Sequence, residues 1–178
     1  MSVIIPPLIE GDAGSAVRVV IYEDLQCKDC AWLRRKLDDR LIPTFADRVG
    51  FEYRDFPLPK HSWARRASVA SKHFQRRSTE LAIGFRREVL GNLSMITEET
   101  LAAWISAFAV RHGQDAEETG CAFEDSAPAA AVESDYQSGI ARGIAKTPTV
   151  LVEEKRFIEN IAIEELIAAI RHRLEKRA

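Results

Sequence analysis

Two cysteines, Cys27 and Cys30, stand at the start of an amphipathic stretch that continues to Leu41. A short β-branched run, residues 17–22, precedes them and has the composition of a buried strand. A strand that delivers Cys-x-x-Cys to the first turn of a helix places the leading sulfur near free backbone N–H groups, which stabilise a thiolate. The spacing also brings the two sulfurs close enough to bridge. The pattern therefore predicts a redox-active pair in which Cys27 is exposed and attacks, and Cys30 is buried and resolves the mixed disulfide.

The two residues between the cysteines carry opposite charges. Lys28 would lower the pKa of Cys27 and Asp29 would raise it, so their tuning effects nearly cancel and the helix N-terminus remains as the activator. Coincidental spacing and half of a zinc site are the alternatives. A zinc site needs further ligands, but the chain has no second Cys-x-x-Cys and its histidines are scattered, so we expect no metal.

The elements around the pair follow from the hydrophobic periodicity. The helix after the strand carries one apolar stripe, and Pro43 predicts a kink or break near Leu41. Residues 49–56 alternate as a second strand, which makes a βαβ unit with parallel strands. Residues 62–138 have almost continuous helical periodicity. A strand over 147–152, a hairpin partner at 156–158 and a helix over 163–174 follow. We expect an α/β fold in which residues 1–61 and 139–178 form one mixed sheet with helices on both faces, and residues 62–138 are an all-helical insertion.

Length and charge exclude some classes of function. With 178 residues and a net charge of −2, the chain has no global field that favours nucleic acid. Three arginine pairs in the helical segment alternate with aromatic residues at core spacings, which indicates solvated helix surfaces. No apolar run is long enough for membrane insertion. The N-terminus lacks a secretory signal, so we expect a cytoplasmic protein if Met1 is the native start, or a periplasmic or extracytoplasmic one if a signal was removed.

Thr147-Pro148 stands at the mouth of the predicted third strand. A proline there cannot join the ladder, and a cis bond would turn the strand mouth toward the dithiol and expose backbone groups to a bound peptide. The dipeptide alone does not decide between cis and trans.

Three segments together resemble the DsbA-like thiol-disulfide oxidoreductases. They are YEDLQCKDC at 22–30, RDFPL at 54–58 with His61 and Ala64 after it, and GIAKTPTV at 143–150. The resemblance runs over nearly the whole chain. It implies a thioredoxin-like fold interrupted by a helical domain, and a cis-proline at Pro148 that faces the dithiol and binds substrate together with Thr147.

The resemblance also implies a function, namely dithiol-disulfide exchange with protein or peptide thiols and disulfides. The Cys27-Cys30 disulfide carries the electrons, so no dissociable cofactor is expected, and an unidentified redox partner would recycle it. Many family members have a buried glutamate six residues before the first cysteine, where this chain has Ile21. The direction of exchange stays open. A glutathione-dependent transferase or isomerase on a DsbA-like scaffold and a non-catalytic thioredoxin-fold binding module are the alternatives.

Four other residues have more than one interpretation. Cys121 is either a buried structural thiol or a redox partner for Cys27. His61 is a surface or capping histidine, or a catalytic one. Asp24 and Glu52 are either solvated carboxylates or proton relays to Cys30.

Overall fold

The computed structural model describes residues 5–120 and 126–177, and these residues contain a five-stranded sheet with the order β1-β3-β2-β4-β5. The strands are β1 (Leu8–Gly11), β2 (Arg18–Glu23), β3 (Gly50–Asp55), β4 (Thr149–Val152) and β5 (Lys155–Ile158). Strands β2 and β3 are parallel, and every other neighbouring pair is antiparallel. The predicted βαβ unit and the C-terminal hairpin are therefore confirmed.

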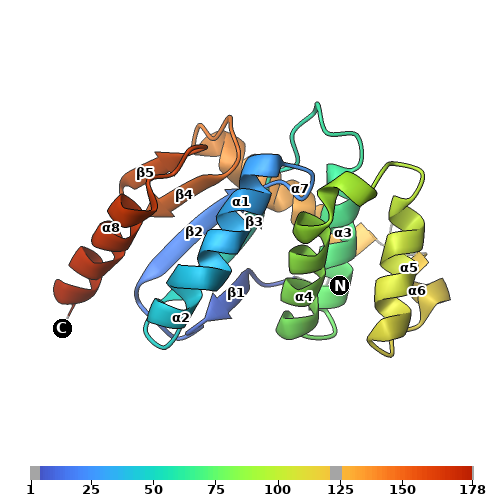
Figure 1. Ribbon diagram of the computed structural model, residues 1–178, viewed down its shortest axis with the longest axis horizontal. Helices are drawn as coiled ribbons and strands as arrows, with labels where there is room; N and C mark the ends of the chain where they lie inside the picture. The colour runs from blue at the N-terminus through green and yellow to red at the C-terminus, as the bar shows by residue number, and fades with distance from the viewer. Residues whose placement is uncertain (1–4, 121–125, 178) are drawn as a thin grey trace.

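Helices occupy both faces of the sheet and one side of the molecule (Figure 1). They are α1 (Lys28–Lys36), α2 (Ile42–Phe45), α3 (Ala64–Gln75), α4 (Thr79–Gly91), α5 (Leu101–Arg111), α6 (Ala116–Gly120), α7 (Ser126–Ala141) and α8 (Ile163–Glu175). Helices α3 to α6 gather on the side of the sheet away from α8. The expected α/β class with a helical insertion is confirmed, and the boundaries at 61/62 and 138/139 stay a prediction.

Alternation along the strands divides the core between the two faces of the sheet. Val19 and Ile21 of β2 are fully buried in the larger cluster, together with Leu33 of α1 and Leu166 of α8. Tyr22, one residue further along β2, belongs to a smaller cluster on the opposite face, next to α7. Both faces of the central strand are thus covered, as its near-continuous apolar composition indicates.

Of the kink or break expected near Leu41, the break does not occur, and the helix is instead irregular at this point. A π-helical turn, Leu37–Leu41, separates α1 from α2, and the chain stays helical to Phe45. Pro43 lacks an N–H group and its ring would collide with the carbonyl four residues earlier, so a wider turn before it relieves the conflict without ending the helix. Leu37 and Leu41 stay buried across this turn.

The edge strand β1 is an element that the sequence analysis missed. It pairs antiparallel with β3 through four residue pairs, from Leu8 with Tyr53 to Gly11 with Gly50. Its four residues follow two prolines and show little alternation, so only the partner strand identifies it. Gly11 has a φ of 90°, and a Cβ there would lie 2.6 Å from the Val49 carbonyl oxygen, so this turn requires glycine.

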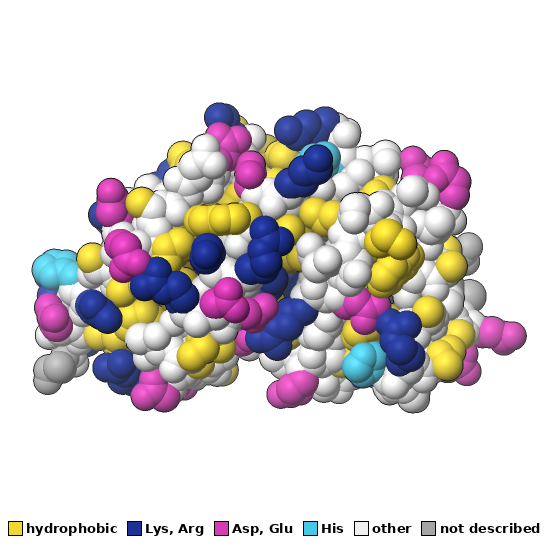
Figure 2. All heavy atoms as spheres, viewed as in Figure 1, with side chains coloured by type: hydrophobic (Ala, Val, Ile, Leu, Met, Phe, Trp, Pro, Cys, Tyr) yellow, Lys and Arg dark blue, Asp and Glu magenta, His cyan; other side chains and the backbone are white. Residues whose placement is uncertain are grey.

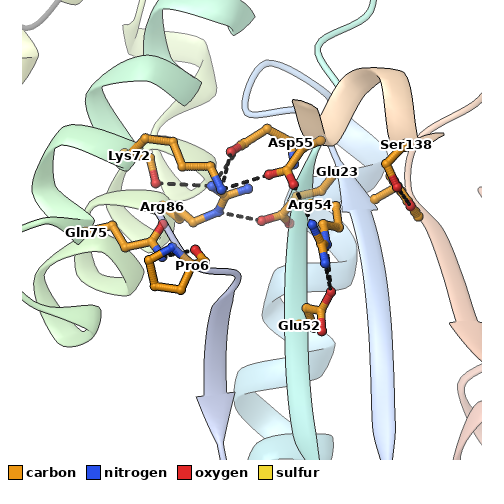
Figure 3. A network of polar contacts seen from close by, with 12 residues as sticks. Pro6, Glu23, Glu52, Arg54, Asp55, Lys72, Gln75, Arg86 and Ser138 are labelled. Atoms are coloured by element: carbon orange, nitrogen blue, oxygen red, sulfur yellow. Dashed lines mark hydrogen bonds and ion pairs between the residues drawn. The ribbon is translucent and has the colours of Figure 1, made fainter. Parts of the chain in front are cut away.

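Buried ion pairs join the ends of the parallel strands to the helical block, which consists of helices α3 to α7 (Figure 3). Glu23 and Asp55 are register partners on β2 and β3, and both are buried. Arg86 of α4 lies between them, with Nε 2.7 Å from Glu23 Oε1 and Nη1 2.9 Å from Asp55 Oδ1. Lys72 of α3 extends the network, with Nζ 2.8 Å from Asp135 of α7 and 3.5 Å from Asp55. Burial alone would raise the pKa of Asp55, but the charges of Arg86 and Lys72 lower it.

Three arginines of these pairs have partners of opposite charge within the protein, namely Arg65, Arg86 and Arg87. Arg65 forms an ion pair with Glu133, Arg86 is buried, and Arg87 contacts Glu10 and Asp38. Figure 2 shows acidic side chains interspersed with the basic ones on the face that it presents, so no continuous basic stripe covers this face. Among the described residues, no helix is long and apolar enough to cross a membrane.

Replacing Arg86 with leucine tests this network. Arg86→Leu leaves two neighbouring carboxylates buried without their bridging charge, and we expect a loss of about 3–5 kcal/mol in the free energy of unfolding, measured with urea. The matched control is Arg87→Leu on the same helix, whose side chain is 42% exposed, and it should cost no more than about 1 kcal/mol.

A double variant tests why Arg86→Leu lowers the free energy of unfolding. Glu23→Gln added to Arg86→Leu should restore part of the stability, because one unpaired buried charge is removed. Equal effects of the two leucine substitutions would contradict the role assigned to the buried ion pairs.

Candidate active site

The Cys-x-x-Cys segment lies where β2 passes into α1. After Glu23 the chain turns, and the Cys27 N–H donates to the Asp24 carbonyl at 3.1 Å. Cys27 is the N-cap residue of α1, and its carbonyl accepts the first helical hydrogen bond, from Ala31 at 3.1 Å. Cys30 lies one turn inward and is fully buried. This is the predicted strand-to-helix placement of the dithiol.

Cys27 is less exposed than the sequence analysis expected. It is only 7% exposed, because the loop before β4 packs against its sulfur. Cys27 Sγ donates to the Thr147 carbonyl oxygen at 3.4 Å. Cys27 is therefore reached through a pocket and not across an open surface.

Hydrogen bonds lower the pKa of the Cys27 thiol from 9.0 to about 6. The Cys30 side chain is the largest cause, and the backbone N–H groups of Cys30 and Asp29 act in the same direction. Burial opposes them. Donors that converge on one sulfur favour its charged form, so Cys27 is largely a thiolate at neutral pH.

The pKa of Cys30 is raised well above 9.0, chiefly by burial. Its hydrogen bond with Cys27, the charge of Cys27 and then the charge of Glu23 raise it further. The Asp24 backbone N–H donates to Cys30 Sγ at 3.4 Å and acts weakly in the opposite direction. The pair therefore combines an ionised outer thiol with a protonated inner one.

Glu23 is a site residue that the sequence analysis missed. The family position for a buried glutamate holds Ile21, but Glu23 lies on the same face of β2, two residues closer to the dithiol. Its Oε2 atom is buried with no hydrogen-bond partner in the described part of the chain. The period of two along the strand was a signal that could have found it.

The loop between the sheet and α7 supplies the opposite wall of the site. The Thr147–Pro148 peptide bond is cis, and both residues are buried. Lys28 and Asp29 lie at the start of α1 with exposed side chains. The backbone of Asp29 is one of the groups that lower the pKa of Cys27. The side chains of Lys28 and Asp29 are not among the groups that shift it.

Asp24 is fully buried, so the first of its two interpretations, a solvated carboxylate, is wrong. Its carboxylate accepts the Gln26 N–H at 2.7 Å and the Leu58 N–H at 2.6 Å. His61 Nδ1 lies 2.8 Å from Asp24 Oδ2. Glu52 is also not solvated, because it is paired with Arg54 on the same strand.

Gln26 fixes the cysteine segment to the helical block. Its Oε1 atom accepts the N–H groups of Trp63 at 2.9 Å and Ala64 at 3.1 Å, which are free donors at the start of α3. These contacts span about forty residues of sequence, so no local pattern marks Gln26 as a capping group.

A pocket of about 730 Å³ opens in front of Cys27. One wall is the start of α1, another is the segment 58–61, and the third is the segment 145–147 with Glu159. Among the described residues, no cluster of three His, Cys, Asp or Glu residues has the arrangement of a metal site. Cys121 lies outside the described residues, so its two interpretations stay predictions.

Comparisons with known proteins agree with the arrangement of the sheet and helices. A family model described as thioredoxin matches residues 5–172. A search of the curated proteins found no match.

Solved structures share the fold at low sequence identity. The oxidised form of BdbD from Bacillus subtilis is 18% identical with a TM-score of 0.84, over 95% of this chain and 93% of that chain. Wolbachia pipientis alpha-DsbA1 is 14% identical with a TM-score of 0.81, over 97% and 92%. The Wolbachia pipientis thiol-disulfide exchange protein alpha-DsbA2 is 16% identical with a TM-score of 0.79, over 93% and 86%. The chain therefore belongs to the thioredoxin family, and it has the fold of DsbA-like proteins with a helical block between the strands of the sheet.

Proposed function

We propose that this chain catalyses thiol–disulfide exchange with protein or peptide substrates, through Cys27 and Cys30. The observation that carries the proposal is the opposite direction of the two pKa shifts within one Cys-x-x-Cys pair. A thiolate at Cys27 is the nucleophile that exchange requires, and a protonated Cys30 keeps the second sulfur inactive until the first has reacted.

In the reducing direction, the Cys27 thiolate attacks a substrate disulfide. A bond forms between Cys27 Sγ and one substrate sulfur, and the other substrate sulfur leaves as a thiolate. Cys27 then no longer carries the charge that raises the pKa of Cys30. Cys30 therefore loses its proton more readily, attacks Cys27 and releases the second substrate thiolate. Oxidation of substrate thiols follows the same steps in reverse.

The loop at Thr147 and Pro148 is the proposed substrate-aligning element. Because the Thr147 carbonyl lies 3.4 Å from Cys27 Sγ, a chain joined to this sulfur passes along the loop. Two electrons are stored in the dithiol, so the reaction uses no dissociable cofactor. Each turnover changes the redox state of the pair, so a thiol or disulfide partner must restore it.

The lowered pKa of Cys27 affects the direction of exchange through the reduction potential of the Cys27–Cys30 pair. A pKa near 6 instead of 9.0 stabilises the reduced enzyme at pH 7 by about 1.4 kcal/mol, which makes its disulfide more oxidising by roughly 30 mV. This shift is small beside the roughly 150 mV that separates thioredoxin from DsbA. The direction of exchange, oxidation or reduction of substrates, is therefore determined by measuring the equilibrium constant between the Cys27–Cys30 pair and glutathione.

Exchange assays with cysteine variants test the proposed function. Wild type should reduce insulin or oxidise a reduced unfolded protein, and Cys27→Ser should abolish both reactions because the attacking sulfur is gone. Cys30→Ser should accumulate a mixed disulfide at Cys27, seen as a mass increase under non-reducing conditions, because the resolving sulfur is missing.

The same variants separate the alternatives. A glutathione-dependent transferase would keep its activity in Cys30→Ser when glutathione is supplied. A binding module would show no exchange in any form. Either result would overturn the proposal.

Titration of the thiols tests the origin of the Cys27 thiolate. In reduced wild type, iodoacetamide should alkylate Cys27 with an apparent pKa near 6. Cys30→Ala should raise that pKa, because it removes the largest stabilising hydrogen bond, whereas Cys30→Ser should raise it less because serine keeps a donor. A pKa unchanged in Cys30→Ala would show that the Cys30 thiol is not the main cause.

The lowered pKa also predicts how stability depends on pH. A thiol whose folded pKa is depressed contributes stability that is complete above the unfolded pKa and is lost as the pH falls through the folded one. The free energy of unfolding of reduced wild type, relative to Cys27→Ser, should therefore rise between about pH 6 and pH 9. Urea unfolding across this range measures it, and a flat difference would contradict the shift.

A further inference from the structure

A buried carboxylate and a histidine form a pair in the wall of the pocket that Cys27 lines. His61 Nδ1 lies 2.8 Å from Asp24 Oδ2, and the side chains are 18% and 0% exposed. His61 contributes to the same pocket as Cys27. The exchange steps described above use neither residue.

The surroundings of Asp24 fix the orientation of the imidazole. The carboxylate accepts backbone N–H groups from Gln26 and Leu58, so its position is set from two segments of the chain. An ionised carboxylate only accepts hydrogen bonds, so the Nδ1 atom of His61 must carry the proton. The Nε2 atom then holds a free lone pair when the ring is neutral.

Asp24 is also fixed relative to the dithiol. Its backbone N–H donates to Cys30 Sγ, and its carbonyl accepts from the Cys27 N–H. A single residue thus contacts both active-site cysteines through its backbone and His61 through its side chain. Asp24 therefore links the position of His61 to the positions of both cysteines.

We propose that His61 is a catalytic acid–base residue that exchanges a proton with the substrate sulfur, and that Asp24 is its positioning residue. This inference rests on the proposed function. In the oxidising direction, Nε2 takes the proton from a substrate thiol, and the resulting thiolate attacks Cys27 Sγ. The Cys27–Cys30 bond breaks, a bond between Cys27 and the substrate forms, and Cys30 takes the electron pair and then a proton from water. Imidazolium returns the extra proton to solvent through the open pocket.

The reverse step uses the same group. Cys30 attacks Cys27 Sγ in the mixed disulfide, the bond between Cys27 and the substrate breaks, and the leaving substrate sulfur takes the proton from the imidazolium. Other charged groups line this pocket: Lys28 and Asp29 at the start of α1, Lys60 beside His61, and Lys146 with Glu159 on the far wall. Lys146 and Glu159 pair with each other at 2.8 Å, whereas Asp24 contacts the imidazole directly.

Substrate thiols of different acidity test the role of His61. The variant His61→Gln keeps a side-chain N–H that can reach Asp24 but cannot exchange a proton near neutral pH. With an alkyl thiol, which is mostly protonated at pH 6.5, we expect its oxidation by the enzyme disulfide to slow about 10²-fold. With an aryl thiol that is already ionised at this pH, the rate should stay within about twofold of wild type, because no proton has to be removed.

The pH profile provides a second readout. The difference between His61→Gln and wild type with the alkyl thiol should vanish as the pH approaches the pKa of the substrate. The control is His172→Gln on the exposed face of α8, outside this pocket, which should match wild type with both thiols. Iodoacetamide titration of reduced His61→Gln should give the same Cys27 pKa as wild type, which shows that His61 does not act through Cys27.

Asp24→Asn tests the positioning role. This variant should show the same selective loss with the alkyl thiol, because the imidazole no longer has its anionic partner. Equal slowing with both thiols would mean that Asp24 acts only through folding, and would overturn its role.

Other outcomes overturn the inference for His61. Equal slowing of both thiols by His61→Gln, no slowing at all, or a shifted pKa of Cys27 would each do so. If the proposed function itself were wrong, wild type and Cys27→Ser would exchange thiols equally slowly, which none of these outcomes requires.

Discussion

Arg86 holds together the part of the molecule on which the site depends. The parallel register of β2 and β3 places two carboxylates, Glu23 and Asp55, side by side where the strands end. Buried like charges repel strongly, so this register needs a cation between them. Arg86 supplies it from α4, with a planar fork that contacts both carboxylates. The helical block is therefore joined to the sheet at the C-terminal ends of β2 and β3, where the cysteine segment begins.

The position of the two cysteines at this strand end explains why their pKa values are shifted in opposite directions. Cys27 is the N-cap residue of α1, where backbone N–H groups and the Thr147 loop converge on its sulfur. Cys30 lies one turn deeper, without solvent and under the influence of Glu23. One turn of helix separates a site that stabilises charge from a site that excludes it. The asymmetry is thus a property of the strand-to-helix junction and not of the two residues between the cysteines.

The contacts of the turn before Cys27 connect the site to the helical block a second time. Asp24 reaches Leu58 and His61, and Gln26 caps the start of α3. Asp24 directly follows Glu23, the last residue of β2, so these contacts and the Arg86 network meet at the same strand end. Solved structures at 14–18% identity share the fold. A fold can be kept by apolar patterning, whereas the polar contacts around a site depend on individual residues.

The sequence by itself determined what depends on neighbouring residues. Periodicity predicted the strand-helix-strand order, the C-terminal hairpin and the helical segment, and the position of Cys27 and Cys30 after a strand predicted their placement at a helix start. These features follow from spacing within one or two elements, so a local pattern is sufficient to recognise them. The edge strand β1 was missed because its identity depends on β3, about forty residues away.

Only the tertiary structure decided which polar residues are buried and with whom. Glu23 and Arg86 are 63 positions apart, and Asp24 and His61 are 37 apart. The sequence left open whether Asp24 is a solvated carboxylate and predicted an exposed Cys27, and both residues are covered by segments distant in the sequence. A charged side chain can be buried only when other parts of the fold supply its hydrogen-bond and ion-pair partners. Local sequence patterns do not show which distant residues these partners are.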